Sequence, residues 1–283
     1  MPQHIEFIHT DHFEKFYHRK KAPASLSLFI DFFWETNFDT LWPANPDGFS
    51  DVLFPNTGYT YLINLGTPFV MQVADKKFPM KTDGFLPRHK AIECYHKPGN
   101  CIFGIKFKTS PIIFEKKINF SEYRESIFPL SYLADATTIK KAKAADSFVE
   151  RVKLMSDYFD RLVTQYSGPL LPVQIVTEIL SDCERNNDFG RPVEELAAAH
   201  HISTRTLQRY FETYTGISTK KVLQIMRVRK AVELLVTEPD RFNLMDFGYY
   251  DHSHFYKHLK QFLQKSTLQK LQPHLPLLAK LHR

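Results

Sequence analysis

The order of hydrophobic and polar positions divides this chain into a strand-like part and a helical part. In residues 101–108, apolar side chains occupy every second position, which is the period of a strand with one buried face. Three further strands are predicted nearby, at residues 50–54, 59–65 and 69–73. Pro and Gly are frequent here and helical periodicity is rare, so residues 1–135 are predicted to form a small antiparallel β-barrel or sandwich.

A helical pattern begins after residue 135. Residues 138–166 contain no Pro or Gly, and apolar residues recur at intervals of four and three, at Phe148, Val152, Met155, Phe159, Leu162 and Tyr166. We predict a linker helix within residues 136–168, closed by Ser167, Gly168 and Pro169. Its apolar seam, residues 148–166, has two alternative uses: contact between two copies in a homodimer, or packing on the chain's own barrel.

Residues 169–283 are predicted to be all helical, so the fold class is α+β. Residues 193–214 are typical of two short helices joined by a tight turn, with apolar residues on one side and polar residues on the other. Ser203 stands where an N-cap is expected. Residues 218–236 are predicted to be one helix of 19 residues, roughly 28 Å long at 1.5 Å per residue. If the short helices on either side of it bind DNA, a connector of this length could place them in successive major grooves, which are about 34 Å apart.

The second short helix has the side chains that suit a major groove. Its outward positions hold Thr204, Arg205, Thr206, Gln208 and Arg209. Arg can pair with guanine, and Gln with adenine, through two hydrogen bonds each. For Arg209 the alternative is an ion pair with Glu212 on the same helix.

A faint internal repeat at an offset of 48 residues predicts a second unit of the same kind. Matched pairs include Leu196 with Leu244, Leu207 with Phe255, Arg209 with Lys257, and Phe211 with Leu259. The second recognition helix would span residues 251–262. Its outward positions are His252, Ser253 and Lys257, and Lys257 is expected to meet phosphate.

Three stretches carry a resemblance to a known family: LAAAHHISTRTLQRYFETYTGIS, RVRKAVELL and GYYDHSHFYKHLKQF. They resemble the DNA-binding region of AraC/XylS-type bacterial transcription regulators. The resemblance implies two helix-turn-helix units joined by one long helix, with Arg205, Gln208 and Arg209 at base edges and Ser203 and Thr206 at phosphates. It also implies that Asp251 caps the second recognition helix and that His254 is structural. WPANPDGFSDVLF and IFGIKFKTSP are similar to cupin-like N-terminal domains that sense a ligand or carry regulation.

The second unit departs from the family pattern. The segment between Ala231 and Gly248 is about two residues short, and Gln264 and Thr267 stand where Gly and Pro are usual. We therefore predict weaker support for the second recognition helix.

Charge and composition agree with a DNA-binding C-terminal part. The chain of 283 residues has a net charge of +6, and its length suits about two domains. From residue 201 onward there are 14 Lys and Arg against 6 Asp and Glu, whereas residues 1–200 hold 23 against 25. A basic excess attracts DNA phosphates. Three scattered cysteines, the absence of a long apolar run and a polar N-terminus predict a cytoplasmic location, with no membrane contact.

Enzyme functions find little support. The densest group of metal-binding residue types, His89, Glu93, Cys94 and His96, lacks the spacing of a cupin metal site. No phosphate-binding Gly loop and no G-x-S-x-G motif occur. We predict no catalytic residue, metal or cofactor. Aromatic residues could line an effector pocket or form core, namely Phe32, Phe33, Trp34, Trp42 and Tyr59.

The sequence therefore predicts a sequence-specific transcription regulator that binds double-stranded promoter DNA through residues 169–283. Its N-terminal domain, residues 1–135, would sense a small molecule or mediate dimerisation. The alternative is a ligand-binding or protein-interaction module whose DNA-binding half has degenerated.

Overall fold

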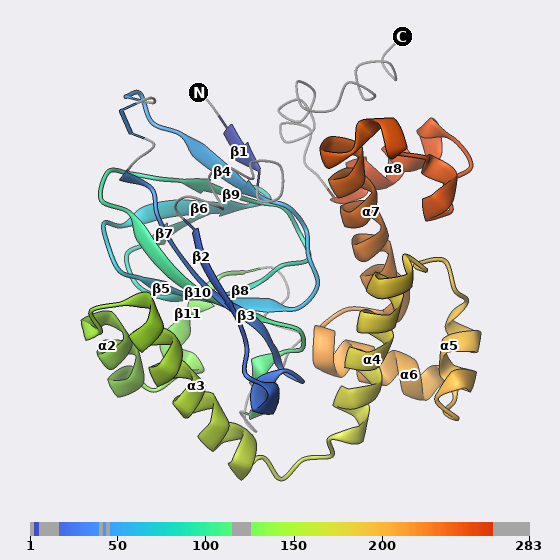
Figure 1. Ribbon diagram of the computed structural model, residues 1–283, viewed down its shortest axis with the longest axis horizontal. Coiled ribbons are helices and arrows are strands. Elements are labelled where there is room, and N and C mark those ends of the chain that lie inside the picture. Colours follow the sequence, from blue (N-terminus) through green and yellow to red (C-terminus); the bar gives the residue numbers. More distant parts are fainter. Residues whose placement is uncertain (1–2, 6–16, 40–41, 44–45, 115–125, 263–283) are drawn as a thin grey trace.

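The computed structural model describes residues 3–5, 17–39, 42–43, 46–114 and 126–262 (Figure 1). These residues form two β-sheets in the N-terminal half and seven α-helices after them. The α+β class and the order of a β-rich part followed by a helical part are confirmed. No α-helix in the described ranges has the length and apolarity needed to cross a membrane.

The first sheet has five strands in the order β1-β4-β9-β6-β7. Its strands are β1 (Gln3–Ile5), β4 (Ser50–Leu53), β9 (Ile92–Tyr95), β6 (Phe69–Val73) and β7 (Lys76–Met80). All neighbours are antiparallel except β1 and β4, which pair in parallel. This parallel pair is one departure from the antiparallel sheet expected from the sequence.

The second sheet has six strands, all antiparallel, in the order β11-β8-β5-β10-β3-β2. Its strands are β11 (Phe128–Pro129), β8 (Gly84–Pro87), β5 (Tyr59–Asn64), β10 (Cys101–Phe107), β3 (Ile30–Asn37) and β2 (Tyr17–Lys21). The two sheets face each other across a small apolar cluster that includes Leu62 and Ile102 from one sheet and Met71 and Cys94 from the other.

The central strands β5 and β10 of the six-stranded sheet are buried on both faces, which corrects the half-buried strand expected at residues 101–108. Every residue of β5 is buried, as are residues 102–107 of β10. Side chains of a strand alternate between the two faces. Ile102 therefore points to the other sheet, while Phe103 and Phe107 point to a covering helix, where they contact Phe148 and Phe159.

Residues 66–68 connect the two sheets. β5 belongs to the six-stranded sheet and β6 to the five-stranded one. Gly66 is required at this crossing because a Cβ there would collide with the carbonyl oxygen of Gly99.

The predicted linker helix is two helices, α2 (Ala136–Ala144) and α3 (Phe148–Gln165). The chain is extended at Ala145, and the Ser147 side chain caps α3 by accepting a hydrogen bond from the Glu150 N–H. The Glu150 carboxylate in turn accepts from the Asp146 N–H at 3.0 Å. This resembles a capping box, and it starts a new helix without Pro or Gly.

The seam of α3 packs on the chain's own pair of β-sheets, which we call the barrel. Val152, Met155 and Phe159 are at most 3% exposed. The Arg151 guanidinium makes two hydrogen bonds to the Glu35 carboxylate of β3, at 2.6 and 2.9 Å, which fixes α3 to the sheet. A homodimer through these apolar side chains would have to displace the barrel, so a dimer must use other surfaces of residues 148–166 or lie elsewhere.

The C-terminal half consists of α4 (Leu171–Asn186), α5 (Val193–Ala199), α6 (Thr204–Thr215), α7 (Thr219–Thr237) and α8 (His252–Phe262). Short 3-10 turns η6 (Pro239–Arg241) and η7 (Leu244–Phe247) separate α7 from α8, while η1 (Ala24–Leu26), η3 (Pro111–Phe114) and η5 (Leu130–Tyr132) lie in the N-terminal half. The long helix α7 runs between α6 and α8 (Figure 1).

The two halves share one continuous apolar core. One cluster contains the outer face of the six-stranded sheet, the seam of α3 and the buried sides of α4 to α8. Polar contacts also cross between the halves: the Thr177 hydroxyl donates to the Leu28 carbonyl at 3.3 Å, and Arg229 donates to the Phe54 carbonyl at 3.5 Å. Boundaries at residues 135 and 168 therefore stay a prediction from the sequence.

Candidate nucleic-acid interface

The first helix-turn-helix unit consists of α5, a tight turn and α6. Pro192 precedes α5, and the turn is tight because the Ile202 N–H returns to the Ala197 carbonyl. His201 supplies a positive φ of 54° within this turn. Ser203 caps α6 by accepting a hydrogen bond from the Thr206 N–H at 3.1 Å, as expected from the sequence.

Helix α6 has one buried side and one open side. Leu207 and Phe211 are fully buried and fix the helix against α4 and α7. The proposed DNA-contacting side chains lie on the other side. Ser203, Thr204, Arg205 and Arg209 are exposed, and Thr206 and Gln208 are partly exposed. The side chains of Arg205 and Arg209 are therefore both open to solvent.

The ion pair considered between Arg209 and Glu212 does not form. Glu212 instead accepts a hydrogen bond from the Gln208 amide, four residues before it, at 2.7 Å. The Arg209 guanidinium lies 5.8 Å from the centre of the Tyr210 ring. Gln208 must therefore break an intrahelical hydrogen bond before it can reach a base, whereas Arg209 gives up only a weak ring contact.

The second unit has a shortened supporting element. Its first helix is the four-residue 3-10 turn η7, where the sequence is about two residues short. Asn243 caps it through the Met245 N–H, and Gly248 ends it with a φ of 68°. Leu244, Phe255 and Leu259 are buried like their repeat partners in the first unit. The second unit thus keeps the buried residues of its core, but its supporting element η7 is shorter than the supporting helix α5 of the first unit.

Helix α8 also has an open side. His252, Ser253 and Lys257 are exposed, as expected of outward positions. The Asp251 carboxylate accepts a hydrogen bond from the His254 N–H at 2.7 Å, so the expected cap is present. Gln264, Thr267 and the C-terminal segment lie outside the described residues.

A cluster of aromatic and basic side chains lies beneath α8. The Arg227 guanidinium of α7 stands 4.9 Å from the centre of the Tyr249 ring, and the His254 and His258 rings contact Tyr249 edge-on. His254 is half-buried, in agreement with a structural role. Burial, followed by the charges of Arg227 and His254, lowers the pKa of His258 from its usual 6.5 to about 4.

The barrel contacts the C-terminal end of α6, which sequence reasoning missed. The Ser110 N–H donates to the Tyr214 carbonyl at 2.7 Å. Gly216, which ends α6 with a φ of 79°, packs so closely on Tyr59 that a Cβ would collide with the tyrosine hydroxyl. No local pattern could reveal this contact, because its partners are more than 100 positions apart in the chain.

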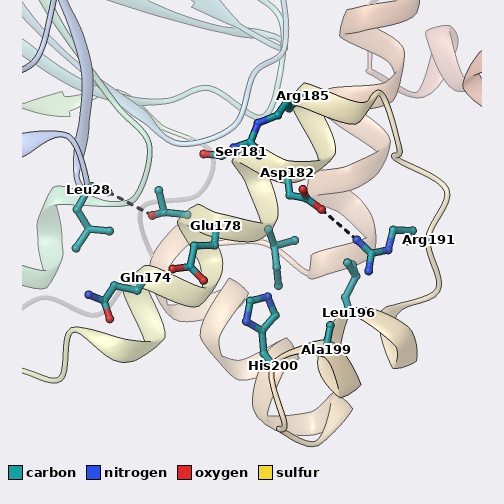
Figure 2. Close-up of a pocket in the computed structure, with 12 residues that line it drawn as sticks. Leu28, Gln174, Glu178, Ser181, Asp182, Arg185, Arg191, Leu196, Ala199 and His200 are labelled. Atoms are coloured by element: carbon teal, nitrogen blue, oxygen red, sulfur yellow. Dashed lines mark hydrogen bonds and ion pairs between the residues drawn. The ribbon is translucent and has the colours of Figure 1, made fainter.

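A surface cavity of about 420 Å³ lies between α4, α5 and Leu28 of the N-terminal half (Figure 2). The side chains of Gln174, Glu178 and His200 surround it, and Asp182 pairs with Arg191 at 3.2 Å beside it. None of the aromatic residues considered for an effector pocket lines this cavity. Of those, Phe33 and Tyr59 are fully buried core residues.

Two of the four residues considered for a metal site form hydrogen bonds with other residues. His96 Nδ1 lies 2.6 Å from the Asn100 side-chain oxygen, and Glu93 accepts a hydrogen bond from Ser50 at 3.3 Å. In the part of the chain that the structure describes, no three His, Cys, Asp or Glu residues are grouped to hold a metal. All three cysteines are free, and burial raises the pKa of Cys101 and Cys183 to about 11, so these thiols are poor nucleophiles near neutral pH.

Distant similarity to solved structures covers most of the chain. A structure of ToxT from Vibrio cholerae is 10% identical, with 88% of this chain and 95% of ToxT aligned at a TM-score of 0.41. A ToxT structure with bound unsaturated fatty acid is 9% identical, with coverage of 87% and 90% and a TM-score of 0.41. The AraC-like transcriptional activator CuxR is 9% identical, with coverage of 78% and 88% and a TM-score of 0.24.

Comparison with curated protein sequences finds no significant match. Comparison with protein families matches residues 196–269 to a helix-turn-helix domain. The matched residues begin in α5 and contain both units with the connecting α7. Residues 196–269 of this protein are therefore a helix-turn-helix domain of the AraC type.

Proposed function

We propose that this protein is a sequence-specific transcriptional regulator that binds promoter DNA through α6 and α8. The observation that carries the proposal is the open side of α6. Arg205 and Arg209 are exposed there, while Leu207 and Phe211 hold the helix from behind. Ser203 and Thr206 at the start of the helix would contact phosphates, and Thr204 would lie beside them at the groove edge.

The connecting helix supports the use of both units. α7 is one helix of 19 residues, which corresponds to roughly 28 Å at 1.5 Å per residue. Successive major grooves on one face of DNA are about 34 Å apart. In this arrangement, His252 and Ser253 would face the second groove and Lys257 a phosphate.

We further propose that the N-terminal half regulates DNA binding, either by sensing a small molecule or by mediating a homodimer. Its contact with the end of α6 at Tyr214 and Gly216 supports this proposal, because a shift of the barrel would act directly on a recognition helix. The three free thiols support a reducing cytoplasm as the place of action.

A binding titration against salt tests the proposed function. The purified full chain is mixed with fragments of the genome that encodes it, and the retained fragments are compared with random duplexes. We expect one class of site to bind at least about 1,000-fold more tightly than random DNA. We also expect affinity to fall steeply with salt, since phosphate contacts release counterions.

The alternative, an interaction module with a degenerate DNA-binding half, is favoured by one observation, the four-residue η7 that supports α8. It predicts weak binding that is equal on every sequence in the same titration. That result would overturn the proposed function.

A further inference from the structure

Tyr250 is an exposed aromatic residue held in a defined position. It is 87% exposed, in the turn between η7 and α8. Its neighbours on both sides are fixed, because Tyr249 is buried and Asp251 caps α8. Its ring stacks on the His254 ring, with centroids 5.9 Å apart and planes inclined by 16°. The Tyr250 hydroxyl is therefore open to solvent, while the ring is held in place by stacking on His254.

This position adjoins the open side of α8. The exposed residues His252 and Ser253 follow within three positions, and Lys257 lies further along the same helix. In helix-turn-helix units the N-terminal residues of the recognition helix approach the bases. The turn before that helix then lies at the edge of the groove, where the phosphates are. Tyrosine hydroxyls are regular donors to DNA phosphates.

The geometry points to a phosphate contact that sequence reasoning did not assign: we propose that the Tyr250 hydroxyl donates a hydrogen bond to a backbone phosphate beside the groove entered by α8. The inference rests on the proposed function. The contact would give the second unit a fixed point on the duplex that the short η7 does not provide. Because a phosphate is the same at every base pair, the contact adds affinity without adding sequence preference.

Tyr250→Phe tests the inference, since it removes only the hydroxyl and keeps the ring that stacks on His254. We expect Tyr250→Phe to weaken binding about threefold to tenfold, the range of one net hydrogen bond. The loss should be equal on cognate and random DNA. Met245→Ala is the matched control, because Met245 is 70% exposed on η7 of the same unit and has no hydroxyl. Its affinity should equal that of the wild type.

Two results would overturn the inference. One is wild-type affinity for Tyr250→Phe; if transcription in a reconstituted system is then reduced, Tyr250 contacts a protein partner instead. The other is a loss confined to the cognate site, which would indicate a base contact. Absence of salt-dependent binding by the wild type would remove the proposed function itself, and the inference with it. Thermal unfolding of each variant checks that the fold is retained.

Discussion

At the scale of single residues, Arg209 and Gln208 of α6 differ in the interactions that their side chains make within the protein. Among the residues that the structure describes, the Arg209 guanidinium interacts with the Tyr210 ring alone, whereas Gln208 is hydrogen-bonded to Glu212. The side chain that is already free loses less on binding, because no intramolecular hydrogen bond has to be exchanged. Arg209 is therefore the stronger candidate for base reading, and Gln208 the weaker.

Substitution of Arg209 by alanine should weaken binding to the cognate site by about 1–3 kcal/mol, with little change on random DNA, if Arg209 reads a base. Quantitative gel shifts on both duplexes measure the two affinities. Arg161→Ala is the control, because Arg161 is an exposed arginine of α3 and its loss changes net charge equally. An equal loss on both duplexes would assign Arg209 to a phosphate.

His258 should make stability depend on pH. Its pKa in the folded chain is about 4, below the usual 6.5. Below pH 6.5 the unfolded chain binds a proton that the folded chain refuses, so the free energy of unfolding should fall as pH drops from about 6.5 towards 4. The charges facing His258 are Arg227 and Lys221 from α7, and His254 and Lys257 from α8. Urea unfolding of wild type and His258→Gln at several pH values measures the effect.

The variant His258→Gln should have a flatter stability profile over that pH range. A profile as steep as that of the wild type would mean that other groups cause the pH dependence. His18→Gln provides a comparison on the N-terminal half, since His18 is exposed on β2.

At the scale of elements, capping fixes where the first recognition helix begins. The Ser203 hydroxyl satisfies the Thr206 N–H, which otherwise has no partner within the helix. Ser203→Ala should therefore destabilise the chain by about 1 kcal/mol, measured by urea unfolding. Ser253→Ala is a useful control, because Ser253 is exposed in the first turn of α8, where Asp251 already provides the cap. Equal effects of the two substitutions would argue against the cap.

The local sequence pattern was sufficient to predict the two helices of the first helix-turn-helix unit and the connecting helix α7. Ser203 and Ser218 cap α6 and α7, and Gly216 ends α6, so the chain itself carries the start and stop signals. The same reasoning failed between α2 and α3, because the break depends on Ser147 and Glu150 and not on Pro or Gly. The second face of β10 is buried by α3, which lies 40 or more positions further along the chain.

The candidate site was predictable in the same uneven way. Helical spacing placed Arg205 and Arg209 on the open side of α6, because period and burial are linked within one helix. The hydrogen bond that engages Gln208 depends on a choice of rotamer, and spacing alone does not decide it.

At the scale of the whole molecule, the close packing of Gly216 on Tyr59 joins the barrel to the recognition helix. A Cβ at Gly216 would collide with the Tyr59 hydroxyl, while the ring carbon Cζ would lie at an acceptable 3.5 Å. The positive φ of Gly216 adds an independent penalty for any other residue. Two separate causes therefore keep this position a glycine, and substitutions can distinguish them.

Gly216→Ala should cost about 1–2 kcal/mol from its backbone conformation and a further 1–3 kcal/mol or so from the collision with Tyr59. In a Tyr59→Phe background the second part should disappear, leaving only the first. A double-mutant cycle by urea unfolding measures the difference. The Ser110 N–H, which bonds to the Tyr214 carbonyl, should exchange its hydrogen faster in Gly216→Ala. Equal costs in both backgrounds would contradict the contact.

Because α7 is one uninterrupted helix, it fixes the angle between the two units as well as their separation. Each residue inserted into it would rotate α8 about the axis by roughly 100°, and would advance it by about 1.5 Å. Seven inserted residues would restore the direction to within about 20°, but would carry α8 about 10 Å further along. If both units bind together, the number of base pairs between their two contact blocks must be the same at every site the protein recognises.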